Sequence, residues 1–123
     1  MTVLSVSEAA QAVGLTTYTL RWYEQEGLVH PVARDSAGRR QYSENDLGFL
    51  TLLTKLRRTG MSVADMRRYA ELIRGGPSTV TARKELLLAH RQRVLDQIAE
   101  LQRDLEAVNY KIDRYFECEK EQP

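Results

Sequence analysis

The chain has 123 residues, 42% of them apolar, and its 18 lysines and arginines against 17 aspartates and glutamates give a net charge of +1. This length allows one compact domain with an extension and leaves no room for a second catalytic domain. We find no apolar stretch long enough to cross a bilayer and no signal peptide, so we expect no membrane partner. The single cysteine, Cys118, closes no intramolecular disulfide, which indicates a reducing, cytoplasmic location.

Two short helices are predicted near the start of the chain. Ser7 precedes the first helix, which ends at Gly14. Thr16 is the expected N-cap of the second helix, from Thr17 to Glu26, which ends at Gly27. Two short helices joined by a glycine-containing turn form a helix-turn-helix, in which the second helix enters the major groove of DNA.

A hairpin and two further helices are predicted next. Short strands over 28–32 and 40–42, joined by a polar turn, would form a wing beside the second helix. Ser43 caps a third helix, 44–59, whose broad apolar face predicts a position in the core. The stretch Ser62–Asp65 resembles a capping box and begins a fourth helix.

The breaker cluster from Gly75 to Ser78 divides the chain. We expect a first domain over 1–75, a linker over 76–79, a single long helix over 80–119 and a tail over 120–123. Apolar residues recur along the long helix at coiled-coil spacing, and their stripe needs a partner helix, which a second copy of the chain would supply. The alternative is a helix folded back on its own domain. The expected dimer contacts are Val94, Ile98, Leu101, Leu105, Val108, Ile112 and Tyr115.

The first domain carries a basic patch inside a nearly neutral chain. Residues 34–58 hold six basic and three acidic side chains, and further polar groups lie at the start of the second helix. Basic groups on the wing and at the end of the third helix would neutralise phosphates on either side of an inserted helix. The expected contacts to double-stranded DNA are Thr16, Thr17, Tyr18, Arg21, Tyr23, Arg34, Arg39, Arg40, Tyr42 and Arg57.

Each of these assignments has an alternative. The aromatic side chains of the second helix could pack in the core, and at least one of Trp22 and Tyr23 is expected to be buried. The arginines could form a solvated face without a partner. Arg21 could bind guanine through two hydrogen bonds or hold a phosphate.

Several spaced motifs resemble one family. They are Val6–Ala10, Gly14–Thr16, the segment Thr19-Leu20-Arg21-Trp22-Tyr23-Glu24, Gly38–Tyr42 and Leu56–Ser62. Together they are similar to the N-terminal domain of the MerR family of transcriptional regulators, over residues 4 to 74. The resemblance is specific because the motifs occur together and in the family's order.

The resemblance implies a mainly α protein: a winged helix-turn-helix DNA-binding domain followed by a long C-terminal helix that forms an antiparallel coiled-coil dimer. Such a homodimer would bind a palindromic promoter and distort its spacer so that RNA polymerase engages both promoter elements. By the same resemblance, Tyr18 and Arg21 face the groove, and Arg40, Tyr42 and Arg57 hold phosphates.

The effector is not evident from the residues. One cysteine cannot hold an iron–sulfur cluster, and no metal motif accompanies it, so we expect no metal or other cofactor. Cys118 is a candidate electrophile sensor, although its acidic neighbours favour an inert thiol. We find no catalytic constellation and expect no enzyme activity. The alternative function is a coiled-coil adaptor that binds another protein through its helix-turn-helix surface.

Overall fold

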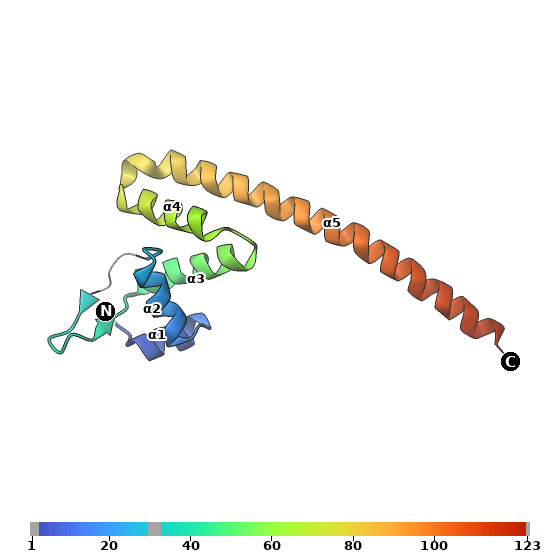
Figure 1. Ribbon diagram of the computed structural model, residues 1–123, viewed down its shortest axis with the longest axis horizontal. Coiled ribbons are helices and arrows are strands. Elements are labelled where there is room, and N and C mark those ends of the chain that lie inside the picture. Colours follow the sequence, from blue (N-terminus) through green and yellow to red (C-terminus); the bar gives the residue numbers. More distant parts are fainter. Residues whose placement is uncertain (1–2, 30–32, 123) are drawn as a thin grey trace. The chain divides into compact units, whose positions relative to one another are not determined.

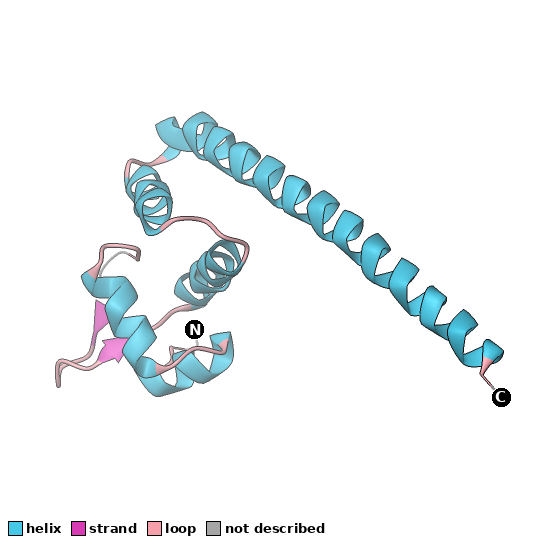
Figure 2. Cartoon of the chain, turned by 45° about the vertical axis from the view of Figure 1, so that its right-hand side comes forward, coloured by secondary structure: helices cyan, strands magenta, loops and turns pink. Residues whose placement is uncertain are grey.

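The computed structural model describes residues 3–29 and 33–122, most of them in helices (Figures 1 and 2). The expected mainly α fold, with a helix-turn-helix domain and a long C-terminal helix, is confirmed. The elements in chain order are α1 (Val6–Val13), α2 (Thr17–Gln25), β1 (Ala33–Arg34), β2 (Arg40–Gln41), α3 (Glu44–Arg58), α4 (Val63–Arg74), the short 3-10 helix η1 (Pro77–Thr79) and α5 (Val80–Glu121).

The chain divides into two compact units between Leu86 and Leu87. This division lies inside α5, so the first turns of the long helix belong to the first unit. The segment expected to be a linker, 76–79, contains η1. Hydrogen bonds of this segment attach it to α4 and to the start of α5. The Thr79 hydroxyl donates to the Leu72 carbonyl of α4, and Arg83 Nη2 of α5 donates to the Gly76 carbonyl at 2.7 Å.

The first helix begins two residues earlier than the sequence suggested. Ser5, not Ser7, is the N-cap: its hydroxyl accepts from the Glu8 amide at 3.2 Å, and the Glu8 carboxylate accepts from the Ser5 amide at 3.0 Å. The prediction of Ser7 is wrong because only Ser5 stands three residues before a glutamate that can complete a capping box. The hydrogen bond from the Ser5 amide lowers the pKa of the Glu8 carboxyl.

The wing is smaller than expected. Leu28 and Val29, predicted as the start of a strand, lie in the turn after α2 with buried side chains, and 30–32 lie outside the described residues. β1 and β2 pair antiparallel, with Ala33 opposite Gln41 and Arg34 opposite Arg40. Tyr42 follows β2 and forms an isolated bridge with Leu4 instead. Burial of the Leu28 and Val29 side chains accounts for the difference, since a wing strand would leave them in water.

The core of the first unit lies between α1, α2, α3 and α4. The prediction that the third helix is central is confirmed, since Leu50, Leu53 and Leu56 of α3 are all buried. Each buried leucine stabilises the fold by about 1.5–3 kcal/mol. Leu20 and Tyr23 of α2 are buried with them, which leaves the opposite side of α2 available to a partner.

The C-terminal end of α2 is fastened to α4 by two arginines. Arg67 Nε donates to the Glu26 carbonyl at 3.0 Å and its Nη2 to the Glu26 carboxylate at 2.8 Å. Arg74 Nη2 donates to the Gly27 carbonyl at 2.9 Å, where the chain turns with a φ of +72°. These hydrogen bonds fix the direction of α2 relative to α4. The two positive charges also stabilise the C-terminal end of the helix.

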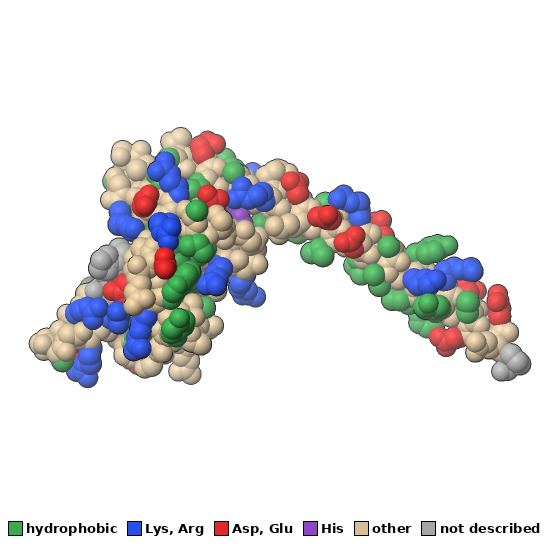
Figure 3. All heavy atoms as spheres, viewed as in Figure 1, with side chains coloured by type: hydrophobic (Ala, Val, Ile, Leu, Met, Phe, Trp, Pro, Cys, Tyr) green, Lys and Arg blue, Asp and Glu red, His purple; other side chains and the backbone are tan. Residues whose placement is uncertain are grey.

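The second unit is the remainder of α5, from Leu87 onward. Its apolar side chains are largely exposed, and Figure 3 shows them along the visible face of the helix. Within the described residues, no helix has the length and apolar character needed to cross a membrane.

Candidate nucleic-acid interface

The N-terminal half of α2 presents polar side chains to solvent. Thr16 caps the helix, because its hydroxyl accepts from the Thr19 amide at 3.1 Å and donates to the Thr19 hydroxyl at 2.9 Å. Thr17 is half-buried, whereas Arg21 is exposed and Tyr18 is 76% exposed. A capped helix N-terminus with exposed hydrogen-bonding side chains is suited to an anionic partner.

The wing turn is organised by Asp35. Its carboxylate accepts from the amides of Ala37 and Arg39, both at 2.9 Å, and from Arg39 Nε at 3.2 Å. These bonds, led by the one from the Arg39 amide, lower the pKa of the Asp35 carboxyl. Gly38 completes the turn with a φ of +81°, which glycine adopts without strain. The wing therefore holds its arginines on a defined backbone.

A groove between α2 and the wing gathers four arginines. It has a volume of about 280 Å³ and is lined by the start of α1 and by Arg21, Arg34, Arg39 and Arg40. The Glu24 carboxylate pairs with Arg40 Nε and lies 3.8 Å from Arg34 Nη2. Arg34, Arg39 and Arg40 each form an ion pair, and among these three the Arg39 side chain is the most exposed, at 80%. The groove is positively charged even after its internal ion pairs form.

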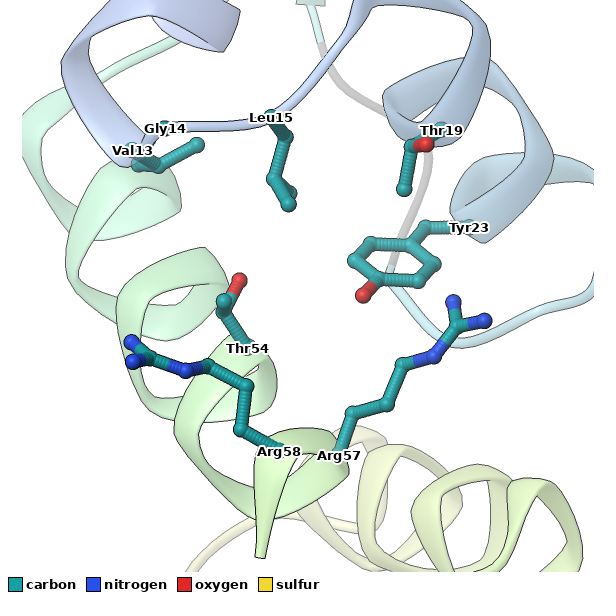
Figure 4. Close-up of a pocket in the computed structure, with 8 residues that line it drawn as sticks. All are labelled: Val13, Gly14, Leu15, Thr19, Tyr23, Thr54, Arg57 and Arg58. Atoms are coloured by element: carbon teal, nitrogen blue, oxygen red, sulfur yellow. The ribbon is translucent and has the colours of Figure 1, made fainter.

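A second hollow lies on the other side of α2. Its volume is about 560 Å³, and Figure 4 shows Val13, Leu15 and Thr19 facing Thr54, Arg57 and Arg58 across it. The Tyr23 hydroxyl is directed into this hollow. The Arg57 guanidinium lies 5.3 Å from the centre of the Trp22 ring, which holds it by a cation–π contact. Hydroxyl and guanidinium donors thus converge on one concave surface.

The expected DNA contacts fall into two groups in the structure. Thr16, Tyr18, Arg21, Arg34, Arg39 and Arg57 are exposed, and Thr17 and Arg40 are half-buried. Tyr23 and Tyr42 are only 1% and 2% exposed, so their rings belong to the core, and their expected contacts with DNA stay a prediction. Burial also raises the pKa of the Tyr42 hydroxyl.

Arg58, expected with Arg57 to neutralise phosphates at the end of the third helix, belongs to this surface, and so do Thr54 and Glu24, which the sequence did not indicate. Arg58 and Thr54 line the hollow of Figure 4, and Glu24 lies between the wing arginines. Arg58 carries a signal in the sequence, since it follows Arg57 at a helix end. No such signal marks Glu24 or Thr54, because only the fold brings them to the arginines and to the hollow.

Charge is distributed unevenly over the first unit. Figure 3 shows lysine and arginine side chains gathered over the wing and the neighbouring part of the unit, with few acidic ones between them. This supports the expectation that a basic face lies within a chain of net charge +1.

Cys118 is exposed on α5, close to an ion pair between Lys120 and Glu117 at 3.4 Å. Among the residues that the structure describes, no group of three or more histidine, cysteine, aspartate or glutamate side chains is arranged to hold a metal ion.

Two family models match the chain. The model described as MerR HTH family regulatory protein covers residues 4–72, and the model described as MerR, DNA binding covers residues 49–107. The first spans the elements that build the groove and the hollow.

Similar proteins are named as transcriptional regulators. An uncharacterized HTH-type transcriptional regulator of Haemophilus influenzae is 40% identical over 111 residues, which are 90% of this chain and 82% of that protein. The crystal structure of HiNmlR, a MerR family regulator lacking the sensor domain, bound to promoter DNA, has a TM-score of 0.88 at 38% identity and covers 98% of this chain and 95% of that one. A regulator structure from Listeria monocytogenes has a TM-score of 0.87 at 34% identity, covering 91% and 85%.

Proposed function

The chain belongs to the MerR family of helix-turn-helix regulatory proteins and is a DNA-binding transcriptional regulator, and from this premise we propose that it binds promoter DNA as a homodimer. One observation carries the proposal: arginine-lined surfaces flank α2 on both sides, the groove beside the wing and the hollow at the end of α3.

This arrangement is suited to a DNA duplex. The major groove is about 12 Å wide, enough for one helix, and a phosphate backbone runs along each of its edges. With α2 in the major groove of DNA, the wing arginines meet one phosphate backbone, and Arg57 and Arg58 meet the other. Phosphate contacts on both sides fix the register of the helix and leave base recognition to its exposed residues.

The proposed contact surface consists of the accessible residues. Tyr18 and Arg21 face the bases or the backbone nearest to them, and Thr16 supplies a capped helix N-terminus. Tyr23 and Tyr42 support this surface from the core. The proposed phosphate contacts are Arg34, Arg39, Arg40, Arg57 and Arg58, with Thr17 at the rim.

The second unit supplies the proposed dimer contacts. Leu101, Leu105 and Val108 are more than half exposed, and such a stripe is stabilised by a second copy of the same helix. Two-fold symmetry of the protein would then be mirrored in a palindromic promoter site. We include in the proposal the family's distortion of the promoter spacer, its engagement with RNA polymerase and a cytoplasmic location.

Arg21→Ala tests the proposal. The probe is a duplex selected by the wild-type protein from a random pool. We expect binding to weaken about tenfold, because a bidentate guanine contact is worth about 1–3 kcal/mol, and a lost phosphate contact would reduce the salt slope by about 0.9. Relaxed specificity at a single base pair would identify a base contact, whereas equal weakening on all sequences would identify a phosphate contact.

Arg103→Ala, which removes the same charge from α5, is the matched control. It should leave DNA binding within about twofold, since exposed single charges away from the contact surface act weakly through salt. If the wild-type protein selects no sequence from the pool at physiological salt, the adaptor function is preferred and the proposal fails.

A further inference from the structure

We propose that Glu24 is a positioning residue for DNA binding: its carboxylate couples α2 to both strands of the wing and orients Arg34 and Arg40 toward the phosphates. This inference rests on the proposed function, since it concerns the same surface. It starts from an anomaly, a carboxylate placed among arginines on a face that we propose for a polyanion.

The contacts join one acidic group to two strands. Glu24 Oε2 accepts from Arg40 Nε, and Oε1 lies 3.8 Å from Arg34 Nη2. Arg34 and Arg40 lie directly opposite each other in the β1–β2 pair. A single side chain of α2 therefore holds both strands of the wing against the helix.

The ion pairs leave donors available for a second anion. Arg40 uses Nε toward Glu24, and a guanidinium has four further N–H groups on its two Nη atoms. Arg34 also donates from Nη1 to the Gly38 carbonyl at 2.8 Å, while its side chain stays 47% exposed. Both arginines are thus restrained in direction without being fully occupied.

The orienting role of Glu24 and its electrostatic repulsion of DNA can be told apart, because they act on affinity in opposite directions. A carboxylate near DNA repels phosphates and lowers affinity for any sequence. Glu24 is only 15% exposed, so salt screens its effect on Arg34 and Arg40 incompletely. If Glu24 orients these arginines, removing its charge will raise the affinity for non-specific DNA and lower the affinity for the specific duplex.

Glu24→Gln tests this, because it keeps the side-chain shape and removes the charge. Two duplexes are compared by fluorescence anisotropy: the one selected by the wild-type protein and a scrambled one of equal length and composition. We expect affinity for the scrambled duplex to rise about threefold and affinity for the selected duplex to fall about tenfold, with a steeper salt dependence on the scrambled duplex.

Two controls accompany the variant. Glu71→Gln, at an exposed carboxylate on α4, makes the same change in net charge and should shift both affinities equally. In an Arg40→Ala background, Glu24→Gln should lose most of its effect on the selected duplex, because the pair it breaks is already absent. Circular dichroism on heating checks that each variant is folded.

Changes of both affinities in the same direction would overturn the inference. A rise in both makes Glu24 a simple electrostatic brake, and a fall in both makes it a general structural residue. The proposed function has its own failure, in which the wild-type protein selects no duplex, so the two failures are distinguishable.

Discussion

Tyr42 shows how burial limits what a side chain can contact. Its ring is 2% exposed, and its main chain exchanges two hydrogen bonds with Leu4, at 2.8 and 2.9 Å. These bonds tie the segment before α1 to the end of the wing. Tyr42 therefore supports the backbone that carries Arg40.

Tyr42→Phe and Tyr42→Ala separate support from contact. We expect Phe to keep DNA affinity within about twofold, because the ring still fills its site, and Ala to destabilise the fold by about 3–5 kcal/mol through the cavity it leaves. Urea unfolding and anisotropy titration measure the two effects. A folded Tyr42→Phe protein that loses DNA binding would show that the hydroxyl reaches DNA.

Asp35 makes the wing turn sensitive to acid. Its folded pKa lies below the ordinary value of 3.8, mainly because of the hydrogen bond from the Arg39 amide. A carboxyl with a lowered folded pKa stabilises the turn above its unfolded pKa, and this contribution is lost as pH falls through the folded pKa. We expect the Ala37 and Arg39 amide resonances to keep their turn-specific shifts at neutral pH and down to the ordinary aspartate pKa of 3.8, and to lose them only at lower pH.

Asp35→Asn should weaken the turn at pH 7, because it removes the negative charge from the oxygen that accepts from the Ala37 and Arg39 amides and loses the bond from Arg39 Nε to the second carboxylate oxygen. The core of the first unit should keep its unfolding midpoint, because Asp35 belongs to the exposed wing. Unchanged Ala37 and Arg39 shifts in this variant would show that the Asp35 carboxylate does not organise the turn.

At the scale of elements, α2 is restrained at several points. Glu24 holds it to the wing, Arg67 and Arg74 hold its C-terminal end to α4, and Arg57 of α3 stacks on Trp22. With α2 held by these contacts, its N-terminal half presents an exposed face. A recognition helix with fixed direction places its base-contacting residues in register with the duplex.

The seam of α5, by which we mean the seven expected dimer contacts from Val94 to Tyr115, can be tested with a pair of exposed residues. Leu105 is 55% exposed and lies on the seam, whereas Tyr110 is 68% exposed and lies off it. We expect Leu105→Glu to give a monomer, because it places a charge in the core of the coiled coil, and Tyr110→Glu to remain a dimer. Sedimentation equilibrium measures both. A dimeric Leu105→Glu protein would require a different interface.

At the scale of the whole molecule, the direction of the proposed coiled coil has a measurable consequence. Cys118 is exposed and is the single cysteine, so one spin label reports one site per protomer. Antiparallel helices centred on the seam separate the two labels by roughly 27 residues, or about 40 Å at about 1.5 Å per residue. Parallel helices bring them within about 20 Å. Double electron–electron resonance distinguishes these distances, and a short distance would contradict the antiparallel dimer.

Local patterns in the sequence determined most of the elements. Thr16, Ser43 and Ser62 cap the helices expected of them, and the leucines of α3 are buried as their spacing predicted. These signals are short-range, since an N-cap or an apolar face is set by residues within a few positions of one another. The family was also evident, because its motifs depend on residue types in a fixed order.

The tertiary structure alone decided which of these residues are exposed and which are buried. It placed Tyr23 and Tyr42 in the core and brought Thr54 into a hollow with Arg57 and Arg58. It also brought Glu24 to Arg34 and Arg40, which lie ten and sixteen positions further along the chain. Burial and ion pairing depend on how distant segments pack, and no local pattern encodes that packing.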